Sequence, residues 1–237
     1  YDGGKFNSND LSLERLDNMV DEGASIIDIG GCSTRPGSES ISLEDEWDRI
    51  KFIIKESVKR YPKKLISVDT YRSEIASRAL SEGVHLINDV SGGSFDSNMF
   101  DVISENDIPY VLMHLRGTPK DMMSKTDYDD LIIDIMSYFK KKIDKLNSLG
   151  VNDIILDPRF GFAKDFDQNF EILDNLSVFS VFDLPILVGL SRKSFIRNKY
   201  GVENSLEGTL EMNKLALEKG AEIIRVHDIK EHRNLIA

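Results

Sequence analysis

Gly83-Val84-His85-Leu86-Ile87-Asn88-Asp89 carries the pattern from which the architecture of this chain follows. A glycine closes an amphipathic segment, a short apolar run comes next, and polar residues end the run. A helix that stops at a left-handed glycine just before a buried strand produces this pattern. Gly23, Gly150 and Gly220 precede further apolar runs in the same way. The sequence therefore predicts a repeat of helix, glycine and strand.

Seven short apolar runs fit buried parallel strands, because enough chain for a helix separates each run from the next. They span residues 26–29, 65–68, 86–87, 110–113, 154–156, 186–188 and 223–226. Repeated alternation of strands and helices means a parallel sheet, either open and doubly wound or closed as a barrel.

The polar residues at the ends of the runs distinguish these two architectures. Nearly every run leads into charged or amide side chains, from Asp28 to Arg225. Ligands of an open sheet gather at one switch point, whereas all strands of a barrel direct their carboxyl ends to one mouth. We therefore predict a single α/β domain over residues 1–237, a (β/α)8 TIM barrel. We expect its first strand to be missing from this sequence, because a closed barrel needs eight strands and Tyr1-Asp2-Gly3-Gly4 leads directly into a helix.

The composition excludes several classes of partner. The 237 residues include 30 Lys and Arg against 41 Asp and Glu, a formal net charge of -11. Nucleic acid and anionic membranes favour basic surfaces, so neither is expected as a partner. The single cysteine, Cys32, cannot form an intramolecular disulfide or a multi-thiolate metal site, which fits a reducing compartment. No apolar run is long enough for a transmembrane helix. We therefore expect a cytoplasmic protein.

Cationic residues follow three of the runs. Ser33-Thr34-Arg35-Pro36-Gly37 offers a guanidinium that suits a phosphate or carboxylate, although a turn whose arginine pairs with a nearby acid explains it as well. Arg225 and His227 would lie on one face of a strand, because strand side chains repeat every two residues, and so form a second anion clamp. Lys193 and Ser194 pair an ammonium with a hydroxyl at a helix start, where anions are favoured.

Acceptor groups end three other runs. Asp69, Asn88 and Asp157 are costly to bury unless a cation or a hydrogen-bond-donating ligand satisfies them, and a planar heterocycle with amino and ring N–H groups would do so. Met113 could cover a flat ring, although a core methionine is the alternative. Dinucleotide and P-loop motifs are absent from the sequence. The sequence predicts a site for a donor-rich ring with an anionic tail.

In this order and spacing, nine stretches resemble the dihydropteroate synthase family of pterin-binding barrels over essentially the whole chain. They are residues 2–4, 33–37, 68–70, 87–93, 113–114 with 116–119, 157–158, 160–162, 191–194 and 225–228. The resemblance implies a transferase of an alkyl group other than methyl, in folate biosynthesis and in a family targeted by sulfonamides. It would condense 6-hydroxymethyl-7,8-dihydropterin diphosphate with 4-aminobenzoate, giving 7,8-dihydropteroate and diphosphate.

The resemblance also assigns residues to the two small-molecule substrates. The pterin would be bound by Asp69, Asn88, Asp157 and Lys193, with Met113 packed on it. The diphosphate would be held by Arg35, Arg225 and His227, and the aminobenzoate would lie among Thr34, Pro36, Phe162 and Ser194. The reaction of the family looks like a dissociative substitution, in which the diphosphate leaves before the amine attacks. Catalysis would then come from electrostatic stabilisation of the leaving group by Arg35, Lys193, Arg225 and His227.

Further expectations follow from the same resemblance. A Mg²⁺ cofactor is implied, but the asparagine that helps to bind it would lie upstream of Tyr1, so no metal ligand is assigned within this chain. A homodimer is implied too. Arg159 replaces the usual glycine after Asp-Pro, where a bulky cation would strain a glycine conformation or add charge beside Asp157.

Two alternatives stay open. A pterin-binding methyltetrahydrofolate methyltransferase would share Asp69, Asn88 and Asp157, but it needs no diphosphate clamp. A non-catalytic pterin-binding paralogue is suggested by the missing strand and by Arg159. The loop around Arg35 and the later anion clamp favour the synthase.

Overall fold

The computed structural model describes residues 8–33, 41–118 and 121–236. The residues form two compact units. Unit 1 consists of Tyr1–Leu112 with Lys145–Asp153, and unit 2 consists of Met113–Asp144 with Ile154–Ala237. That the chain is a single domain stays a prediction.

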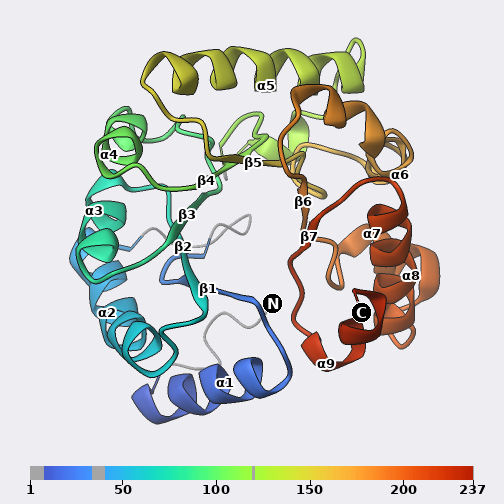
Figure 1. Cartoon of the computed structure of the whole chain (residues 1–237). Helices are drawn as coiled ribbons and strands as arrows, with labels where there is room; N and C mark the ends of the chain where they lie inside the picture. The colour runs from blue at the N-terminus through green and yellow to red at the C-terminus, as the bar shows by residue number, and fades with distance from the viewer. Residues whose placement is uncertain (1–7, 34–40, 119–120, 237) are drawn as a thin grey trace. The chain divides into compact units, whose positions relative to one another are not determined.

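Unit 1 is built on parallel strands in sequence order (Figure 1). These are β1 (Ile26–Gly30), β2 (Leu65–Asp69), β3 (Leu86–Asp89) and β4 (Tyr110–Met113), of which Met113 belongs to unit 2. The register places Gly30 beside Asp69, and Asp69 beside Asn88. Because the strands are parallel, the polar residues at their carboxyl ends share one edge of the sheet.

Helices of unit 1 lie outside these strands in Figure 1. They are α1 (Asn9–Asp21), α2 (Leu43–Arg60), α3 (Ser73–Ser81) and α4 (Met99–Asn106). The α2 helix begins where the Ser42 hydroxyl accepts a hydrogen bond of 3.0 Å from Asp45 N, and it buries Ile50 and Ile54 one turn apart. Capping and an apolar stripe at helical spacing together account for this helix.

Unit 2 contains the remaining strands and helices. Its strands are β5 (Ile154–Asp157), β6 (Leu187–Val188) and β7 (Ile223–Ile224). Its helices are α6 (Phe166–Asp174), α7 (Ser194–Tyr200), α8 (Ser205–Glu218) and α9 (Ile229–His232), with 3-10 turns η1 (Met122–Ser124), η2 (Leu176–Phe182) and η3 (Arg233–Leu235). The helix α5 (Leu131–Ser148) contributes to both units. Strands β6 and β7 are parallel, and Leu156 of β5 bridges to Ile186.

The glycines behave as the sequence predicts. Gly23, Gly83, Gly150 and Gly220 all have positive φ angles, between 84° and 101°. Each lies just after α1, α3, α5 or α8. The helix, glycine and strand repeat is therefore confirmed, and so are the seven strands that it predicts within the described residues.

The last predicted strand was too long. Strand β7 ends at Ile224, so Arg225 and His227 do not lie on one face of a strand. Arg225 N still donates to Val188 O at 2.8 Å, but His227 N donates to the Ser191 hydroxyl at 3.3 Å. At His227 a side chain, rather than a neighbouring strand, therefore takes the backbone donor.

Aromatic packing fixes the loop after β5. The rings of Phe160 and Phe195 are stacked with centroids 6.2 Å apart, and Phe170 meets Phe195 edge-on at 5.4 Å. These contacts tie the Phe160–Phe162 stretch to α6 and α7.

Among the described residues, no helix combines the length and apolarity that crossing a membrane requires.

Candidate active site

The carboxyl ends of β2 and β3 form the acceptor group of unit 1. Asp69 and Asn88 are paired in register. Asn88 is 3% exposed, and its Nδ2 donates to Asp28 Oδ2 at 3.0 Å, while its buried Oδ1 receives no hydrogen bond from the described residues. A buried carbonyl oxygen of this kind fits a ligand that donates hydrogen bonds. Asp28, which the site assignment omitted, belongs to the same group.

Asp89 shapes the loop that follows Asn88. It is fully buried and accepts hydrogen bonds from Ser91 N at 2.7 Å, Gly93 N at 2.8 Å and the Tyr110 hydroxyl at 2.7 Å. Burial raises the pKa of the Asp89 carboxyl, and these hydrogen bonds oppose the rise. Asp89 is therefore a structural residue that fixes the backbone beside Asn88.

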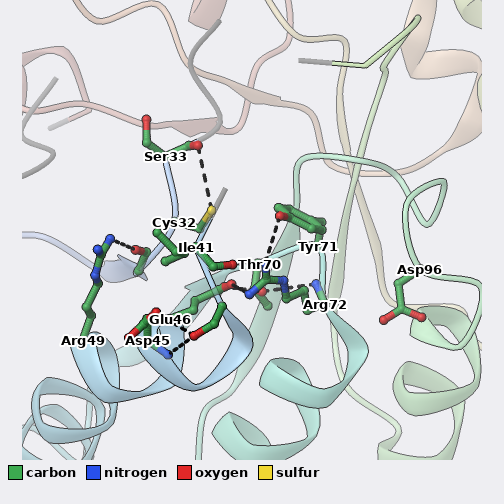
Figure 2. A network of polar contacts seen from close by, with 12 residues as sticks. Cys32, Ser33, Ile41, Asp45, Glu46, Arg49, Thr70, Tyr71, Arg72 and Asp96 are labelled. Carbon is green, nitrogen blue, oxygen red and sulfur yellow. Dashed lines mark hydrogen bonds and ion pairs between the residues drawn. The ribbon is translucent and has the colours of Figure 1, made fainter. Parts of the chain in front are cut away.

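Thr34, Arg35 and Pro36 lie outside the described residues, but the chain on both sides is held by arginines (Figure 2). Arg49 Nη1 donates to Gly31 O at 3.2 Å, and Arg72 Nη2 donates to Ile41 O at 2.6 Å.

The Glu46 carboxylate of α2 anchors the second of these arginines. Glu46 is fully buried. It accepts a 2.8 Å hydrogen bond from the Thr70 hydroxyl and lies 3.0 Å from Arg72 Nη1. Burial raises the pKa of Glu46, while the Thr70 hydrogen bond and the Arg72 charge oppose the rise.

We expect Arg72→Leu to lower the free energy of unfolding by about 3 kcal/mol near neutral pH, because it leaves Glu46 buried without its countercharge. Removing that charge raises the pKa of Glu46 further. A carboxyl whose pKa is raised in the folded state destabilises the protein at pH values above that pKa. The destabilisation disappears at pH values below the pKa of the unfolded state, for which the reference value is 4.5. The deficit should therefore shrink as the pH falls towards 5.

Urea unfolding of the wild type and of Arg72→Leu, near neutral pH and at about pH 5, measures this deficit. Arg78→Leu is the matched control, because Arg78 pairs with the largely exposed Glu44 and Glu74, and surface pairs contribute little. Equal losses for the two variants, or a deficit independent of pH, would contradict the role of Glu46.

In unit 2, Asp157 ends β5 and is 5% exposed. Its Oδ1 accepts a 2.7 Å hydrogen bond from Arg159 N, and its carbonyl accepts one of 2.8 Å from His114 N. Burial raises the pKa of the Asp157 carboxyl, while the positive charges of Arg159, Lys193 and Lys164 oppose the rise. This carboxylate therefore lies at the centre of a cationic cluster.

Lys193 approaches the same cluster from the start of α7. The side chain is half-buried, with its Nζ donating to Phe160 O at 2.6 Å and lying 5.6 Å from the centroid of the Phe162 ring. Burial lowers the pKa of Lys193 to about 7, with a further lowering by the charge of Arg159. Near neutral pH the amine can therefore act either as a donor cation or as a neutral base.

Three residues of this cluster were not assigned as substrate-binding from the sequence. Arg159 is 6% exposed, Lys164 5% and His114 3%. Lys164 Nζ lies 3.1 Å from His114 Nδ1, and burial holds the pKa of both groups well below their usual ranges. Lys164 lies two residues after the Phe160–Phe162 stretch, and this proximity was the signal in the sequence that could have pointed to it.

The anion-binding candidates of unit 2 lie around the turn before α7. Arg192 makes two hydrogen bonds to the Asp228 carboxylate, of 2.9 and 2.7 Å, and so ties this turn to the chain after His227. Ser194 begins α7, and Arg225 is exposed. The charge of Arg225 contributes to the lowered pKa of Lys193, so these two cations share one electrostatic environment.

The predicted site residues thus fall into two described groups. Asp69 and Asn88 meet in unit 1. The members in unit 2 are Met113, Asp157, Phe162, Lys193, Ser194, Arg225 and His227. Met113, Asp157 and Phe162 all contact Arg159.

The fit of the described residues to magnesium can be tested by their chemistry. They contain no group of three or more His, Cys, Asp or Glu side chains that could hold a metal ion. Mg²⁺ commonly binds through one or two protein oxygens together with substrate phosphates, which requires no such group. The described part of the chain offers no preformed metal centre.

Comparisons with known proteins show which family the chain belongs to. The dihydropteroate synthase of Synechocystis is 41% identical over 234 residues, which is 97% of this chain and 81% of that protein. The Yersinia pestis dihydropteroate synthase, solved with a sulfonamide drug complex, has a TM-score of 0.93 at 36% identity, covering 99% of this chain and 86% of its own. This likeness confirms the α/β barrel class predicted from the sequence.

A second solved structure agrees. The dihydropteroate synthase of Clostridium difficile, in the presence of pteroic acid, has a TM-score of 0.89 at 39% identity, covering 98% of this chain and 88% of that chain. The family model of pterin binding enzymes matches residues 1–227. With relatives this similar over nearly its whole length, the chain belongs to the family of pterin binding enzymes.

Proposed function

We infer that this chain catalyses the dihydropteroate synthase reaction, which joins 6-hydroxymethyl-7,8-dihydropterin diphosphate to 4-aminobenzoate and releases diphosphate. The observation that carries this inference is the cluster of unit 2, in which a buried carboxylate, a lysine, a thioether and an aromatic ring meet. Its members are Asp157, Lys193, Met113 and Phe162. The 41% identity to a dihydropteroate synthase supports the same activity.

The proposed roles follow from the chemistry of the substrates. Asp157 accepts hydrogen bonds from the amino and ring N–H groups of the pterin, as Asp69 and Asn88 do at their own strand ends. Lys193 donates to the acceptor atoms of the ring while it is protonated. Met113 packs on the ring face through its polarizable sulfur.

The reaction is a substitution at the methylene carbon of the pterin. The C–O bond to diphosphate breaks, its electron pair leaves with the diphosphate, and the pterin ring stabilises the resulting cation. The aminobenzoate nitrogen then forms the C–N bond and loses a proton to solvent. Arg225 and His227, with Arg35, stabilise the departing negative charge, and Phe162 and Ser194, with Thr34 and Pro36, orient the amine.

Diphosphate release tests this function directly. We expect the full-length protein to release one diphosphate per dihydropteroate when it is given both substrates, with and without added magnesium as separate arms. A reaction without 4-aminobenzoate is the control for simple hydrolysis. No release at any magnesium concentration would exclude the synthase and favour a non-catalytic pterin-binding protein.

The same preparation tests the methyltransferase alternative. A methyltetrahydrofolate methyltransferase would transfer a methyl group and release no diphosphate. The homodimer that the resemblance implies and the cytoplasmic location expected from the composition both stay predictions. Sedimentation of the full-length protein measures its oligomeric state, and fractionation of its native cells measures its location.

A further inference from the structure

Arg159 adopts a backbone conformation that suits glycine. Its φ angle is +55°, in the left-handed region that side chains with a Cβ rarely occupy. The neighbouring Gly161 and Ala163 also have positive φ angles, of 95° and 55°. The expectation that an arginine after Asp157-Pro158 would sit in a glycine-like conformation is confirmed. The chain therefore keeps a bulky cation at a position where the backbone disfavours it.

The side chain of Arg159 is turned into the cluster of unit 2 and not towards solvent. Only 6% of the residue is exposed. Its guanidinium carbon lies 4.0 Å from the centroid of the Phe162 ring, and its Nη1 donates to Met113 Sδ. Its backbone N donates to Asp157 Oδ1 at 2.7 Å. One residue thus contacts three of the predicted substrate-binding residues.

The physical chemistry of the contact favours a defined geometry. A guanidinium is planar and weakly hydrated, so it stacks on an aromatic face, and the attraction strengthens when both groups are removed from water. A buried charge is costly unless it is compensated. The carboxylate of Asp157 and the face of Phe162 supply that compensation. The stack therefore favours the orientation in which the face of the Phe162 ring meets the guanidinium.

We propose that Arg159 is a positioning residue of the synthase site, which holds the Phe162 ring and the Met113 thioether in place for the two aromatic substrates. The proposal rests on the proposed function, because Phe162 is assigned to the aminobenzoate and Met113 to the pterin. It adds to that function a residue for which the family pattern has only a glycine.

The charge of Arg159 gives a second, independent readout. Lys193 faces Asp157, Arg159 and Arg225, and it also interacts with the buried Lys164. Asp157 raises the pKa of Lys193, whereas burial, Arg159 and Arg225 lower it to about 7. Neutralising Arg159 should therefore raise the pKa of Lys193. Protonated Lys193, and the turnover that depends on it, would then persist to higher pH.

Three variants of the full-length protein separate these effects. Arg159→Gln removes the charge and the stack, Arg159→Lys keeps the charge but loses the planar stack, and Arg159→Gly also relieves the left-handed backbone. We expect the KM for 4-aminobenzoate to rise about tenfold in Arg159→Gln and Arg159→Gly, and less in Arg159→Lys. The alkaline limb of the kcat profile should move to higher pH in the Gln and Gly variants only.

Asp183→Gly is the matched control. Asp183 has a φ angle of 54° and lies directly after η2 at an exposed position. Its substitution relieves the same kind of backbone strain without touching the cluster. We expect both glycine variants to unfold at a higher temperature, and only Arg159→Gly to show altered kinetics.

The outcomes are distinct. An active wild type whose KM for 4-aminobenzoate and pH profile are unchanged in a folded Arg159→Gln would overturn the positioning role alone. Variants that lose activity only in proportion to lost folded protein would overturn that role as well. A wild type that releases no diphosphate would refute the synthase function, and the positioning role with it.

Discussion

Arg225→Ala should lower kcat/KM for the pterin diphosphate by about 100- to 1,000-fold, the usual cost of removing one donor that stabilises developing negative charge. Arg225 follows β7 directly, and its backbone N is fixed by a 2.8 Å hydrogen bond to Val188 O. The side chain is exposed, so it can reach a ligand without a large desolvation cost. A guanidinium at this point suits a departing diphosphate because it can donate two hydrogen bonds.

The comparison of two ligands makes this prediction specific. Binding of the pterin diphosphate should weaken strongly in Arg225→Ala, whereas binding of a pterin without the diphosphate should hardly change. Isothermal titration with both ligands measures the difference. Arg197→Ala is the control, since Arg197 is an exposed arginine on α7. Equal losses for the two ligands would remove Arg225 from the diphosphate clamp.

The second large effect is expected for Asp157→Asn, which should weaken both pterins alike, by about 100-fold. The amide is nearly isosteric with the carboxylate, but it presents a donor where the ring needs an acceptor. It also removes the negative charge that faces Arg159, Lys193 and Lys164. Because these cations no longer have this counterion, the pKa of Lys193 should fall. As the pH rises, the variant should therefore lose activity at a lower pH than the wild type does.

Titration with the two pterins and a pH–rate profile measure both consequences. Asp174→Asn is the control, because the Asp174 side chain is 69% exposed and makes a surface ion pair with Lys219. If the variant bound the pterin without diphosphate as tightly as wild type does, the ring would have to bind elsewhere. Asp69→Ala should give the same pattern, with both pterins weakened.

The strands were predictable because they depend on local patterns. Glycine after a helix and an apolar run of four residues are both visible in the sequence, and the run at 110–113 matches β4 (Tyr110–Met113) residue for residue. The departure of His227 from the strand pattern was not predictable, because its backbone N donates to the hydroxyl of Ser191. These residues are 36 positions apart, and their meeting follows from packing.

The sequence contains a signal for the buried acid of unit 1, but the neighbouring acidic residues mask it. The Glu44-Asp45-Glu46 stretch resembles a solvated helix face, yet Glu46 is fully buried. Glu46, Ile50 and Ile54 are spaced four residues apart on α2, so helical periodicity places the acid on the buried face. Its partner Arg72 lies beyond β2 and could not be identified from spacing.

The unit 2 cluster depends on contacts that no single position reveals. Asp157, Lys193 and Phe162 were identified as separate candidates, whereas the contacts of Arg159 with them and with Met113 arise only in the folded chain. Lys164 and His114 form their pair across 50 positions. Periodicity and spacing along the sequence do not predict which distant side chains will pair in this way.

The guanidinium packed on Phe162 also has a consequence for the selectivity of small-molecule inhibitors. A compound that extends an anionic or electron-rich group towards this wall would meet a cation in this protein, and no side chain at all where glycine follows the Asp-Pro pair. Such a compound would discriminate between enzymes that share every direct substrate contact, because the difference lies in a residue that acts on the substrates only through its neighbours.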